Sequence, residues 1–391
     1  MLNQEVYDKV VAEFAAKFGG APEAVAYAPG RIEVLGNHTD YNEGYVFSAA
    51  IDKGTFFAAS PAADDKVTLV AVDMGETYET TLGEVKKVES GATWANYPLG
   101  TFNWLMGGEP AKAGRGFKAA FGGNIPLGAG LSSSAALEMA AALALQKLYG
   151  TTFGKTELAK IGQKAEHTFA GCPCGLLDQA SSMYGQAGAL VKSDFRTNEF
   201  ESVKVGDGVA FMMVKSNAKH ALVDGAYASR RKACEDAAKH FAGVLRKKVT
   251  HLRDVTMAEW VLYRDGLDET TARRAVHPIG EDERVLQGAA LLEKGDLRGF
   301  GALMFDSHES SRRWFENSCE ELDAIVDAAK GIPGVYGARL SGGGFGGSCC
   351  LLVDPAAADS IAAGISAAYK AKFGDEPECS LVKPSEGART V

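Results

Sequence analysis

Two glycines and three serines stand directly before a long alanine-rich stretch, in the segment Pro126-Leu-Gly-Ala-Gly-Leu-Ser-Ser-Ser-Ala-Ala-Leu-Glu138. The residues from about Ser134 to Tyr149 have helical composition, so the serines stand at the expected start of a helix. Unpaired N–H groups and the helix dipole attract anions there, and glycines let a phosphate approach the backbone. Serine also caps ordinary helices, but serines preceded by glycines favour the anion site. The segment therefore predicts a phosphate-binding loop.

Two rival phosphate motifs fit less well. Gly150-Thr-Thr-Phe-Gly-Lys-Thr156 has three residues between its glycines, where a P-loop needs four, and it joins two expected helices. Gly128-Ala-Gly-Leu-Ser-Ser lacks the third glycine of a dinucleotide fingerprint, and no clear strand–helix–strand unit follows it. A P-loop enzyme is therefore not predicted, and a dehydrogenase is a weak interpretation.

A second polar cluster is Arg31-Ile-Glu-Val-Leu-Gly-Asn-His-Thr-Asp-Tyr41. Arginine, asparagine, histidine and aspartate together offer both donors and acceptors, which suits a polyol ligand whose hydroxyl groups both donate and accept. A solvated turn also favours Asn, Asp and Gly. Taken alone, the cluster leaves both interpretations open.

Two further segments are rich in glycine. Gly171-Cys-Pro-Cys-Gly-Leu-Leu-Asp-Gln179 places Asp178 beside glycine and proline, twelve residues after Glu166, so the two carboxylates could serve as a base and a metal ligand. A helix cap explains the same residues. Leu340-Ser-Gly-Gly-Gly-Phe-Gly-Gly-Ser348 indicates backbone that passes close to a ligand or another strand, or a tight bulge in a sheet.

The elements that must position these segments fall into groups. Extended structure is expected at 25–35, 45–51, 54–60, 67–73, 117–121, 189–214 and 338–353, and helices near the N-terminus and at 94–106, 134–149, 155–169, 228–242, 256–263, 281–293, 316–330 and 356–373. Because strands and helices are grouped rather than strictly alternating, the pattern favours an α+β fold with antiparallel sheets. We place a domain boundary near residue 205, which gives domains 1–205 and 206–391.

Composition narrows the function classes. The 391 residues are 46% hydrophobic and 23% charged, with a net charge of -9, which gives no basic footprint for nucleic acid or anionic membranes. No run of about 18 apolar residues predicts a membrane span. Seven cysteines, an odd number in close pairs, fit reduced thiols in the cytoplasm better than a disulfide framework. Cys172 and Cys174 form CxC rather than CxxC, so a structural zinc site is not predicted.

Taken together, the four segments resemble the GHMP kinases and, within them, the galactokinase family. APGRIEVLGNHTDYNEG is similar to that family's sugar-binding motif, PLGAGLSSSAALE to its phosphate loop, CPCGLLDQ to its catalytic segment and ARLSGGGFGG to its C-terminal glycine motif. Trp94-Ala-Asn-Tyr97, Ser216-Asn-Ala-Lys-His220, Tyr227 and Arg230-Arg231 agree as well. The resemblance covers about residues 23–353. It implies an N-terminal domain like ribosomal protein S5 domain 2, a ferredoxin-like C-terminal domain and a site between them.

The resemblance also implies roles for single residues. Asp178 would take the proton from the C1 hydroxyl of the sugar, and Arg31 would keep Asp178 ionised and stabilise the transferring phosphoryl group. The implied sugar contacts are Asn37, His38, Thr39, Asp40, Gly175 and Tyr227. ATP phosphates would lie on Gly128, Ala129, Gly130, Leu131, Ser132, Ser133 and Ser134, with Mg²⁺ held by Ser134 and Glu166. The implied reaction is ATP-dependent phosphorylation of galactose, or a close relative, at C1.

One departure from the family's pattern concerns specificity. The family usually has glutamate where this chain has Asn37 and asparagine where it has Glu33. An amide at 37 keeps an acceptor, adds two donors and removes a charge. A sugar with a modified C6, such as galacturonate, is therefore an alternative substrate.

Other functions stay open at this point. A galactokinase-like sensor would bind sugar and ATP without turnover, although relatives of that kind lose parts of the phosphate loop or the base, and both are present here. Mevalonate or homoserine kinase activity would leave the HTDYN segment unexplained. We expect sugar and ATP as the only partners, a monomer or weak homodimer, and a cytoplasmic location.

Overall fold

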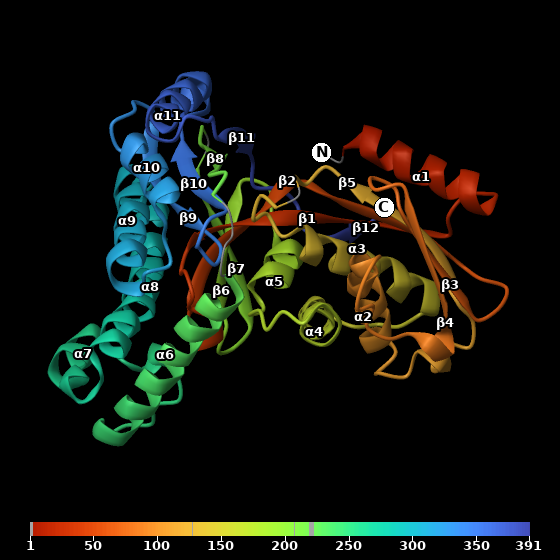
Figure 1. Cartoon of the computed structure of the whole chain (residues 1–391), viewed down its shortest axis with the longest axis horizontal. Helices are drawn as coiled ribbons and strands as arrows, with labels where there is room; N and C mark the ends of the chain where they lie inside the picture. The colour runs from red at the N-terminus through yellow and green to blue at the C-terminus, as the bar shows by residue number, and fades with distance from the viewer. Residues whose placement is uncertain (1–2, 127, 207, 219–222) are drawn as a thin grey trace.

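The computed structural model describes residues 3–126, 128–206, 208–218 and 223–391. Leu127 of the glycine–serine segment, and Lys219 and His220 of the Ser216–His220 stretch, lie outside the described residues. Figure 1 shows two halves, each built on its own sheet, which meet where β1 runs past α5. No helix in the described ranges is both long and apolar enough to cross a bilayer.

The first sheet has eight strands. They are β1 (Ala24–Leu35), β2 (Tyr45–Pro61), β3 (Lys66–Ala71), β4 (Glu76–Thr81), β5 (Phe117–Gly123), β6 (Ala189–Asp194), β7 (Glu199–Lys204) and β12 (Arg389–Thr390). Their order is β12-β1-β2-β5-β3-β4, and β6 pairs with the beginning of β2 and with β7. The long strand β2 joins the two extended runs expected at 45–51 and 54–60.

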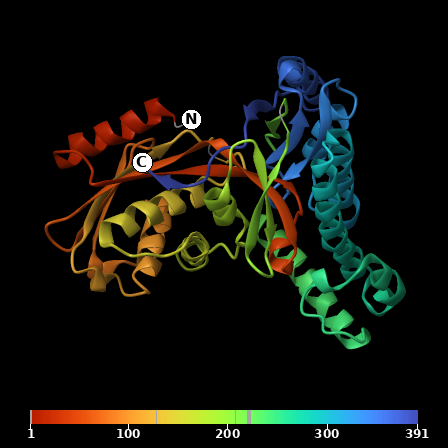
Figure 2. The same cartoon turned by 180° about the vertical axis from the view of Figure 1, so that it is seen from behind.

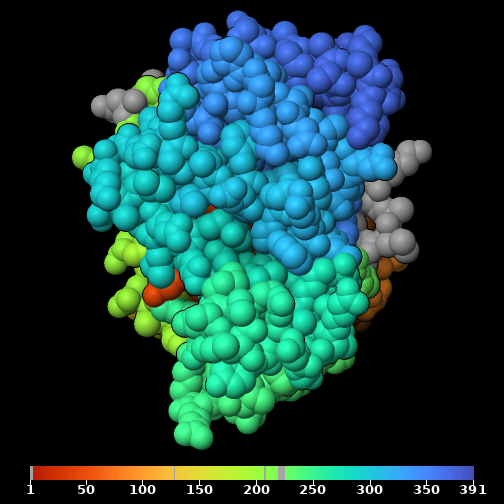
Figure 3. All heavy atoms as spheres, turned by 90° about the vertical axis from the view of Figure 1, so that its left-hand side faces the viewer, coloured from red at the N-terminus to blue at the C-terminus, as the bar shows by residue number. Residues whose placement is uncertain are grey.

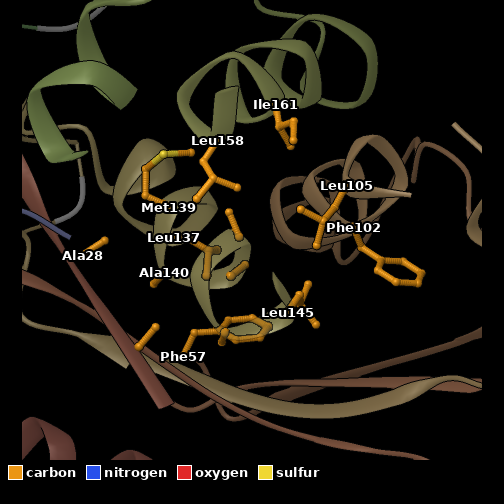
Figure 4. Close-up of a cluster of buried hydrophobic side chains, with 14 of the residues drawn as sticks. Ala28, Phe57, Phe102, Leu105, Leu137, Met139, Ala140, Leu145, Leu158 and Ile161 are labelled. Carbon is orange, nitrogen blue, oxygen red and sulfur yellow. The ribbon is translucent and has the colours of Figure 1, made fainter. Parts of the chain in front are cut away.

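Helices cover both faces of this sheet. The helix α1 (Gln4–Phe18) lies on one face, and α2 (Asn96–Leu105), α3 (Ser133–Tyr149), α4 (Lys155–Ala165) and α5 (Leu177–Tyr184) lie on the other (Figure 1). The core between them is apolar: Phe57 of the sheet faces Leu137 and Leu145 of α3, with side chains of α2 and α4 behind (Figure 4). Six alanines of α3 are buried, and their small side chains let this helix pack closely on β1 and β2.

The second sheet has four strands in the order β11-β8-β10-β9. They are β8 (Ala210–Lys215), β9 (Val335–Ser341), β10 (Ser348–Val353) and β11 (Glu378–Val382). Alternate residues of β8 face different cores: Met212 packs with α10 (Glu320–Ala329) and α11 (Ala358–Phe373), and Met213 packs toward α8 (Glu269–Glu293) and α9 (Leu297–Ser310). Figure 3 looks onto this helical face, whose lower part belongs to α6 (Val223–Val244) and α7 (Met257–Tyr263).

The end of the chain returns to the first sheet. After β11, the segment 383–391 crosses back, and β12 pairs with β1 through Ala26 opposite Thr390 and Tyr27 opposite Arg389. The C-terminal end therefore lies beside β1, close to α1 (Figure 2). Along the way Ala388 N–H donates to the Ser182 carbonyl at 2.8 Å, which ties this segment to α5.

The α+β architecture expected from the sequence is confirmed, with three differences. The pair β3–β5 is parallel, whereas the other strand pairs among the described residues are antiparallel. The helix expected over 155–169 ends as an α-helix at Ala165 and continues as one π-helical turn, Glu166–Ala170. The helices α5 and α9 and the strands β4, β11 and β12 were not predicted, because these segments are short or lack a clean apolar period.

Candidate active site

A cavity of about 570 Å³ opens where the two halves meet. It is lined by β1 and the turn after it, the loop before α5, the start of α6 and the glycine run after β9, namely Arg31, Glu33, Asn37, His38, Asp40, 170–175, Leu177, Asp178, Tyr227, Ala228, Gly342 and Gly343. The structure thus brings three of the four sequence motifs to one cavity. The fourth, the glycine–serine segment, reaches it through Ser132, as described below.

Arg31 and Glu33 reach the cavity because of their spacing on β1. Residues two apart on a strand share a face, so these two charged side chains point the same way while Ile32 and Val34 face the core. The pairing of β1 with β2 shifts register between Pro29 and Arg31 and again after Glu33. Such bulges re-aim side chains and are typical beside functional sites.

Asp178 is held by two partners at the start of α5. Its Oδ1 accepts hydrogen bonds from Arg31 Nε and Nη2, both at 2.7 Å, and its Oδ2 accepts one from the Ser132 hydroxyl. The Asp178 side chain is 23% exposed while that of Arg31 is 8% exposed, so the carboxylate remains open to the cavity and the guanidinium lies behind it. This is the arrangement expected of an oriented base.

The glycine–serine segment is bound to the same arginine. Arg31 Nη1 donates to the Gly130 carbonyl at 2.6 Å, and Arg31 N–H donates to the Leu131 carbonyl at 3.1 Å. Gly128 and Gly130 have φ of +69°, which glycine adopts without strain. Ser132 also lies in the left-handed region, at φ +54°, just before α3 begins.

The remaining members of the loop have distinct places. Ser133 and Ser134 are the first two residues of α3, where N–H groups have no partner within the helix. Ala129 is buried, and its carbonyl accepts a hydrogen bond from Ser348 Oγ at 2.7 Å. The start of β10, directly after the glycine run, is therefore bonded to the glycine–serine segment across the two halves.

Asp40 points at the loop before α5. A Cβ placed on Gly175 would lie 1.6 Å from Asp40 Oδ2, so only glycine fits there. Burial raises the pKa of Asp40 to about 7, helped by the charges of Glu33 and Asp178. At neutral pH this carboxyl is therefore close to half protonated in the free protein.

His38 and Thr39 shape the turn between β1 and β2. His38 Nε2 donates to the Gly343 carbonyl at 3.2 Å and Nδ1 accepts from the Tyr41 hydroxyl at 2.7 Å; burial lowers its pKa to about 4, so the ring is neutral. Its ring packs 5.2 Å from that of Tyr227, the residue that α6 brings to the cavity. Thr39 is fully buried, its hydroxyl lies near the Gly36 and Tyr45 carbonyls, and it does not line the cavity described.

Asn37 and Glu33 form a buried pair. Asn37 Nδ2 donates to Glu33 Oε1 at 2.9 Å and to the Gly342 carbonyl at 2.8 Å, and its Oδ1 accepts from Asn317 at 3.0 Å. Both side-chain donors of Asn37 are therefore used by protein groups. Glu33 accepts from Arg339 at 3.3 Å and from Gly342 N–H at 3.2 Å. This chain has Glu33 and Asn37 where the family usually has asparagine and glutamate, so one carboxylate and one amide still lie side by side.

The turn that carries Asn37 is held from the other half of the molecule. Glu281 of α8 accepts hydrogen bonds from the N–H groups of Gly36, at 2.9 Å, and Asn37, at 2.8 Å. Burial by itself would raise the pKa of Glu281, but the charge of Arg284, with smaller contributions from His277 and Arg339, lowers it to about 2. A fully ionised, buried carboxylate thus anchors the sugar-motif turn.

Oxygen groups gather behind Asp178 at the start of α3. Glu166 Oε2 accepts from Gln179 Nε2 at 3.2 Å, and the same amide donates to Glu138 Oε2 at 2.9 Å. Glu166 also hydrogen-bonds the Ser134 side chain. Burial raises the pKa of Glu138, and the charge of Glu166 raises it further. The buried atoms Glu138 Oε1 and Gln179 Oε1 have no hydrogen-bond partner. Orphaned oxygens and crowded carboxylates fit a hard divalent cation such as Mg²⁺.

A second cavity, of about 460 Å³, adjoins the first, since Ala170 lines both. Trp94 and Tyr97 line it, together with Lys87 and Asn96. Asn96 is fixed by a pair of hydrogen bonds with the Val88 backbone, at 2.7 and 2.9 Å. Trp94 and Tyr97 belong to a stretch that resembles the family's sequence.

Several site residues were missed by sequence reasoning. Glu138 stood inside the quoted glycine–serine segment, and its burial on an alanine-rich helix was the available signal. Gln179 likewise stood inside the quoted catalytic segment. Glu281 and Asn317 carried no signal, because they come from distant helical sequence and reach the site only through tertiary packing.

Comparisons with known proteins agree with this geometry. The model of the GHMP kinase N-terminal domain matches residues 96–186, the galactokinase galactose-binding signature matches 12–61, and the GHMP kinase C-terminal model matches 289–371. Human galactokinase is 38% identical over 385 residues, covering 97% of this chain and 95% of its own length. Galactokinase of Bos taurus is 38% identical over 372 residues, covering 93% of this chain and 92% of its own.

Solved structures show the same fold. The crystal structure of Lactococcus lactis galactokinase complexed with galactose superposes with a TM-score of 0.90 at 31% identity, covering 97% of this chain and 98% of that one. A mevalonate kinase structure, at 19% identity and a TM-score of 0.62, covers 93% of this chain and 99% of that one and shares the fold alone. The two-domain GHMP kinase fold expected from the sequence is thereby confirmed. By its motifs, its fold and its full-length relatives, this chain belongs to the galactokinase family of the GHMP kinases.

Proposed function

We propose that this protein transfers the terminal phosphoryl group of ATP to the C1 hydroxyl of galactose, giving galactose 1-phosphate and ADP. The observation that carries the proposal is the Asp178 carboxylate, oriented by Arg31 and Ser132 and open to a cavity of about 570 Å³. Full-length galactokinase relatives and the galactose-binding signature at 12–61 support galactose as the acceptor.

In this proposal Asp178 accepts the proton of the C1 hydroxyl as that oxygen attacks the phosphorus atom. Arg31 orients the carboxylate and places positive charge beside the transferring group. No covalent enzyme intermediate is required, because the residues need only position the two substrates and stabilise charge. The sugar contacts would come from Glu33, Asp40 and the backbone at Gly175, with Asn37 and His38 holding these groups in place.

The glycine–serine segment would bind the ATP phosphates through the N–H groups at the start of α3. Ser134 and Glu166 would hold Mg²⁺, with Glu138 nearby, and the ion would neutralise charge on the phosphates. The cavity beside Trp94 and Tyr97 would receive the nucleoside.

The contacts of Asn37 do not favour galacturonate. The two donors that an amide at this position adds are bound to Glu33 and Gly342, so neither remains for a C6 carboxylate. Glu33, Asp40 and Asp178 already place three carboxyl groups around the cavity. A negatively charged sugar would meet repulsion from at least the ionised members of that set.

The test is ADP release with Mg-ATP and galactose, galacturonate, N-acetylgalactosamine, glucose or arabinose. We expect turnover on galactose, and a kcat reduced about 10²–10⁴-fold in Asp178→Asn, with galactose binding retained. Asp359→Asn, on the exposed side of α11, is the matched control and should leave kcat unchanged.

Three outcomes would contradict the proposal. Full turnover by Asp178→Asn would show that Asp178 is not the base. Turnover on galacturonate alone would show that galacturonate, not galactose, is the acceptor. Sugar and nucleotide binding with no turnover on any acceptor would make the protein a sensor.

We also propose that the chain divides into domains 1–205 and 206–391, that it is a monomer or weak homodimer, and that it is located in the cytoplasm. The change of sheet between β7 and β8 supports the boundary, and free thiols at all seven cysteines suit a reducing compartment.

A further inference from the structure

Three potential metal ligands meet beside Asp178 in a way that the phosphoryl transfer does not require. Glu166, Cys172 and Cys174 bring one carboxylate oxygen and two sulfur atoms within 4.8 Å of one another. Cys174 Sγ donates to Glu166 Oε2 at 2.8 Å. The mechanism above uses Glu166 but neither sulfur.

The backbone conformation explains why Cys172 and Cys174 lie close to Glu166. The π-helical turn Glu166–Ala170 ends at Gly171 with φ of +77°, which reverses the chain. Cys172 N–H then donates to the Glu166 carbonyl at 3.0 Å, and Cys174 N–H donates to the Cys172 carbonyl at 2.9 Å. His167 Nε2 donates to the Cys174 carbonyl at 2.8 Å. The two thiols are therefore held in place by backbone contacts rather than carried on a free loop.

The separations suit a tetrahedral ion with thiolate ligands. Zn–S bonds of about 2.3 Å and Zn–O bonds of about 2.0–2.2 Å place neighbouring ligand atoms about 3.3–3.8 Å apart. Ligand atoms already within 4.8 Å reach those separations through small side-chain movements. Cys172 is exposed and Cys174 half-buried, and both line the large cavity, so an ion can enter from solvent.

We propose that Glu166, Cys172 and Cys174 form a binding site for a thiophilic divalent cation of the Zn²⁺ class. Both thiols release their protons to solvent as the two Zn–S bonds form, and the carboxylate of Glu166 supplies the third ligand. The fourth position of the ion remains open to water. Thiolates select zinc over magnesium, so the site differs in chemistry from the oxygen groups around Ser134.

The site overlaps with the magnesium position through Glu166. Resting on the proposed function, Zn²⁺ bound by the two thiolates withdraws Glu166 from Mg²⁺ and places a second cation beside Asp178. Phosphoryl transfer is then inhibited by Zn²⁺, and excess Mg²⁺ relieves the inhibition.

The first experiment measures binding without reference to activity. The full-length protein, reduced and then freed of reductant and metal, is titrated with Cd²⁺ while thiolate-to-metal charge-transfer absorption is followed. We expect one tight equivalent, displaced by Zn²⁺, that is lost in Cys172→Ser and in Cys174→Ser. Cys379→Ser is the control, because Cys379 is similarly half-buried but lies in β11 of the second sheet.

The second experiment measures inhibition. Galactose-dependent ADP release is followed at fixed Mg-ATP with increasing Zn²⁺, and each variant is normalised to its own rate in the presence of a chelator. Loss of an outer-shell partner alone costs roughly 10–100-fold in metal affinity, so we expect half-inhibition of Cys172→Ser at roughly 10-fold higher Zn²⁺ or more. Cys379→Ser should match the parent.

The outcomes separate the two proposals. No charge-transfer band at one equivalent, or a band that survives in Cys172→Ser, overturns the metal site whatever the activity. Binding without inhibition overturns the competition with Mg²⁺. Absence of galactose turnover in the untreated protein overturns the proposed function, while the Cd²⁺ titration still decides the site.

Discussion

Asp40 lines the cavity, and its protonation state changes near neutral pH. Burial raises its pKa to about 7, with Glu33 and Asp178 adding to the shift and Arg231 opposing it. The ionised carboxylate accepts stronger hydrogen bonds from sugar hydroxyls than the neutral acid does. Galactose affinity should therefore rise as pH increases through about 7, by roughly 1 kcal/mol or about fivefold.

Calorimetric titration of galactose binding between pH 5.5 and 8.5 checks this. Asp40→Asn should bind more weakly and without the pH dependence. Asp282→Asn is the control, because burial also raises the pKa of Asp282 to about 7, yet its carboxylate accepts from Tyr45 N–H and does not line the cavity. Unchanged pH dependence in Asp40→Asn would refute the assignment.

Glu33 and Asn37 should behave as one unit. Asn37→Glu alone would place a second carboxylate at the position of an amide that now lies 2.9 Å from Glu33, so we expect loss of stability and of galactose affinity. Combining Asn37→Glu with Glu33→Asn should recover much of both, with a coupling energy of about 1–3 kcal/mol. Unfolding in urea and galactose KM are measured for the parent, the two single variants and the double variant. If the effects of the two single substitutions simply add, the two side chains act independently.

At this scale the sequence predicted which residue types gather but not their partners. Arg31 and Asp178 were placed by resemblance, and the structure adds that Ser132 holds the other carboxylate oxygen. The specificity hypothesis for Asn37 considered one side chain alone. The hydrogen bond between Glu33 on β1 and Asn37 in the turn depends on the bulges in β1. No local sequence pattern indicates those bulges.

The helix α8 contributes one buried charge to the site in the other half of the molecule. Replacing Glu281 by Gln leaves Arg284 without its ion-pair partner and weakens two backbone contacts to the turn at Gly36 and Asn37. We expect the free energy of unfolding to fall by about 3 kcal/mol at pH 7, with galactose KM raised. Glu283→Gln, exposed on the same helix, is the control for urea unfolding and should change stability little.

Glu281→Gln should also change how the free energy of unfolding depends on pH in acid. Because the folded-state pKa of Glu281 is lowered to about 2 against an ordinary value of 4.5, its contribution is present above pH 4.5 and is lost as pH falls toward 2. Glu281→Gln should therefore lose less stability than the parent across that window. An identical decline in both proteins would show that Glu281 does not titrate there.

Elements with a strong local signal were predictable, and elements defined by distant partners were not. The start of α3 was predicted to within a residue because glycines, serines and alanines change there together. The π-helical turn Glu166–Ala170 has no composition of its own, and β12 is a strand only because β1 lies beside it. Strand pairing across the whole chain is not contained in any short window of sequence.

The C-terminal segment 383–391 adds a connection between the two halves of the molecule, which also share a buried core and the cavity. Removing residues 384–391 would free one edge of β1 and the hydrogen bond from Ala388 to α5, which carries Asp178. We expect the unfolding temperature to fall by at least about 5 °C and kcat to fall even where the shortened chain is folded. Calorimetry and ADP release test this, with removal of Val391 alone as control. An unchanged kcat would show that α5 needs no support from this segment.

The pairing of β1 with β12 also has a consequence in time. The strand β1 is made long before residues 389 and 390. At about 5–20 residues per second it stays without this neighbour for about 18–72 s of synthesis. During that interval its open edge is a surface for association with other nascent chains. A polypeptide released from the ribosome before residue 388 would lack both the cover for that edge and the support behind Asp178.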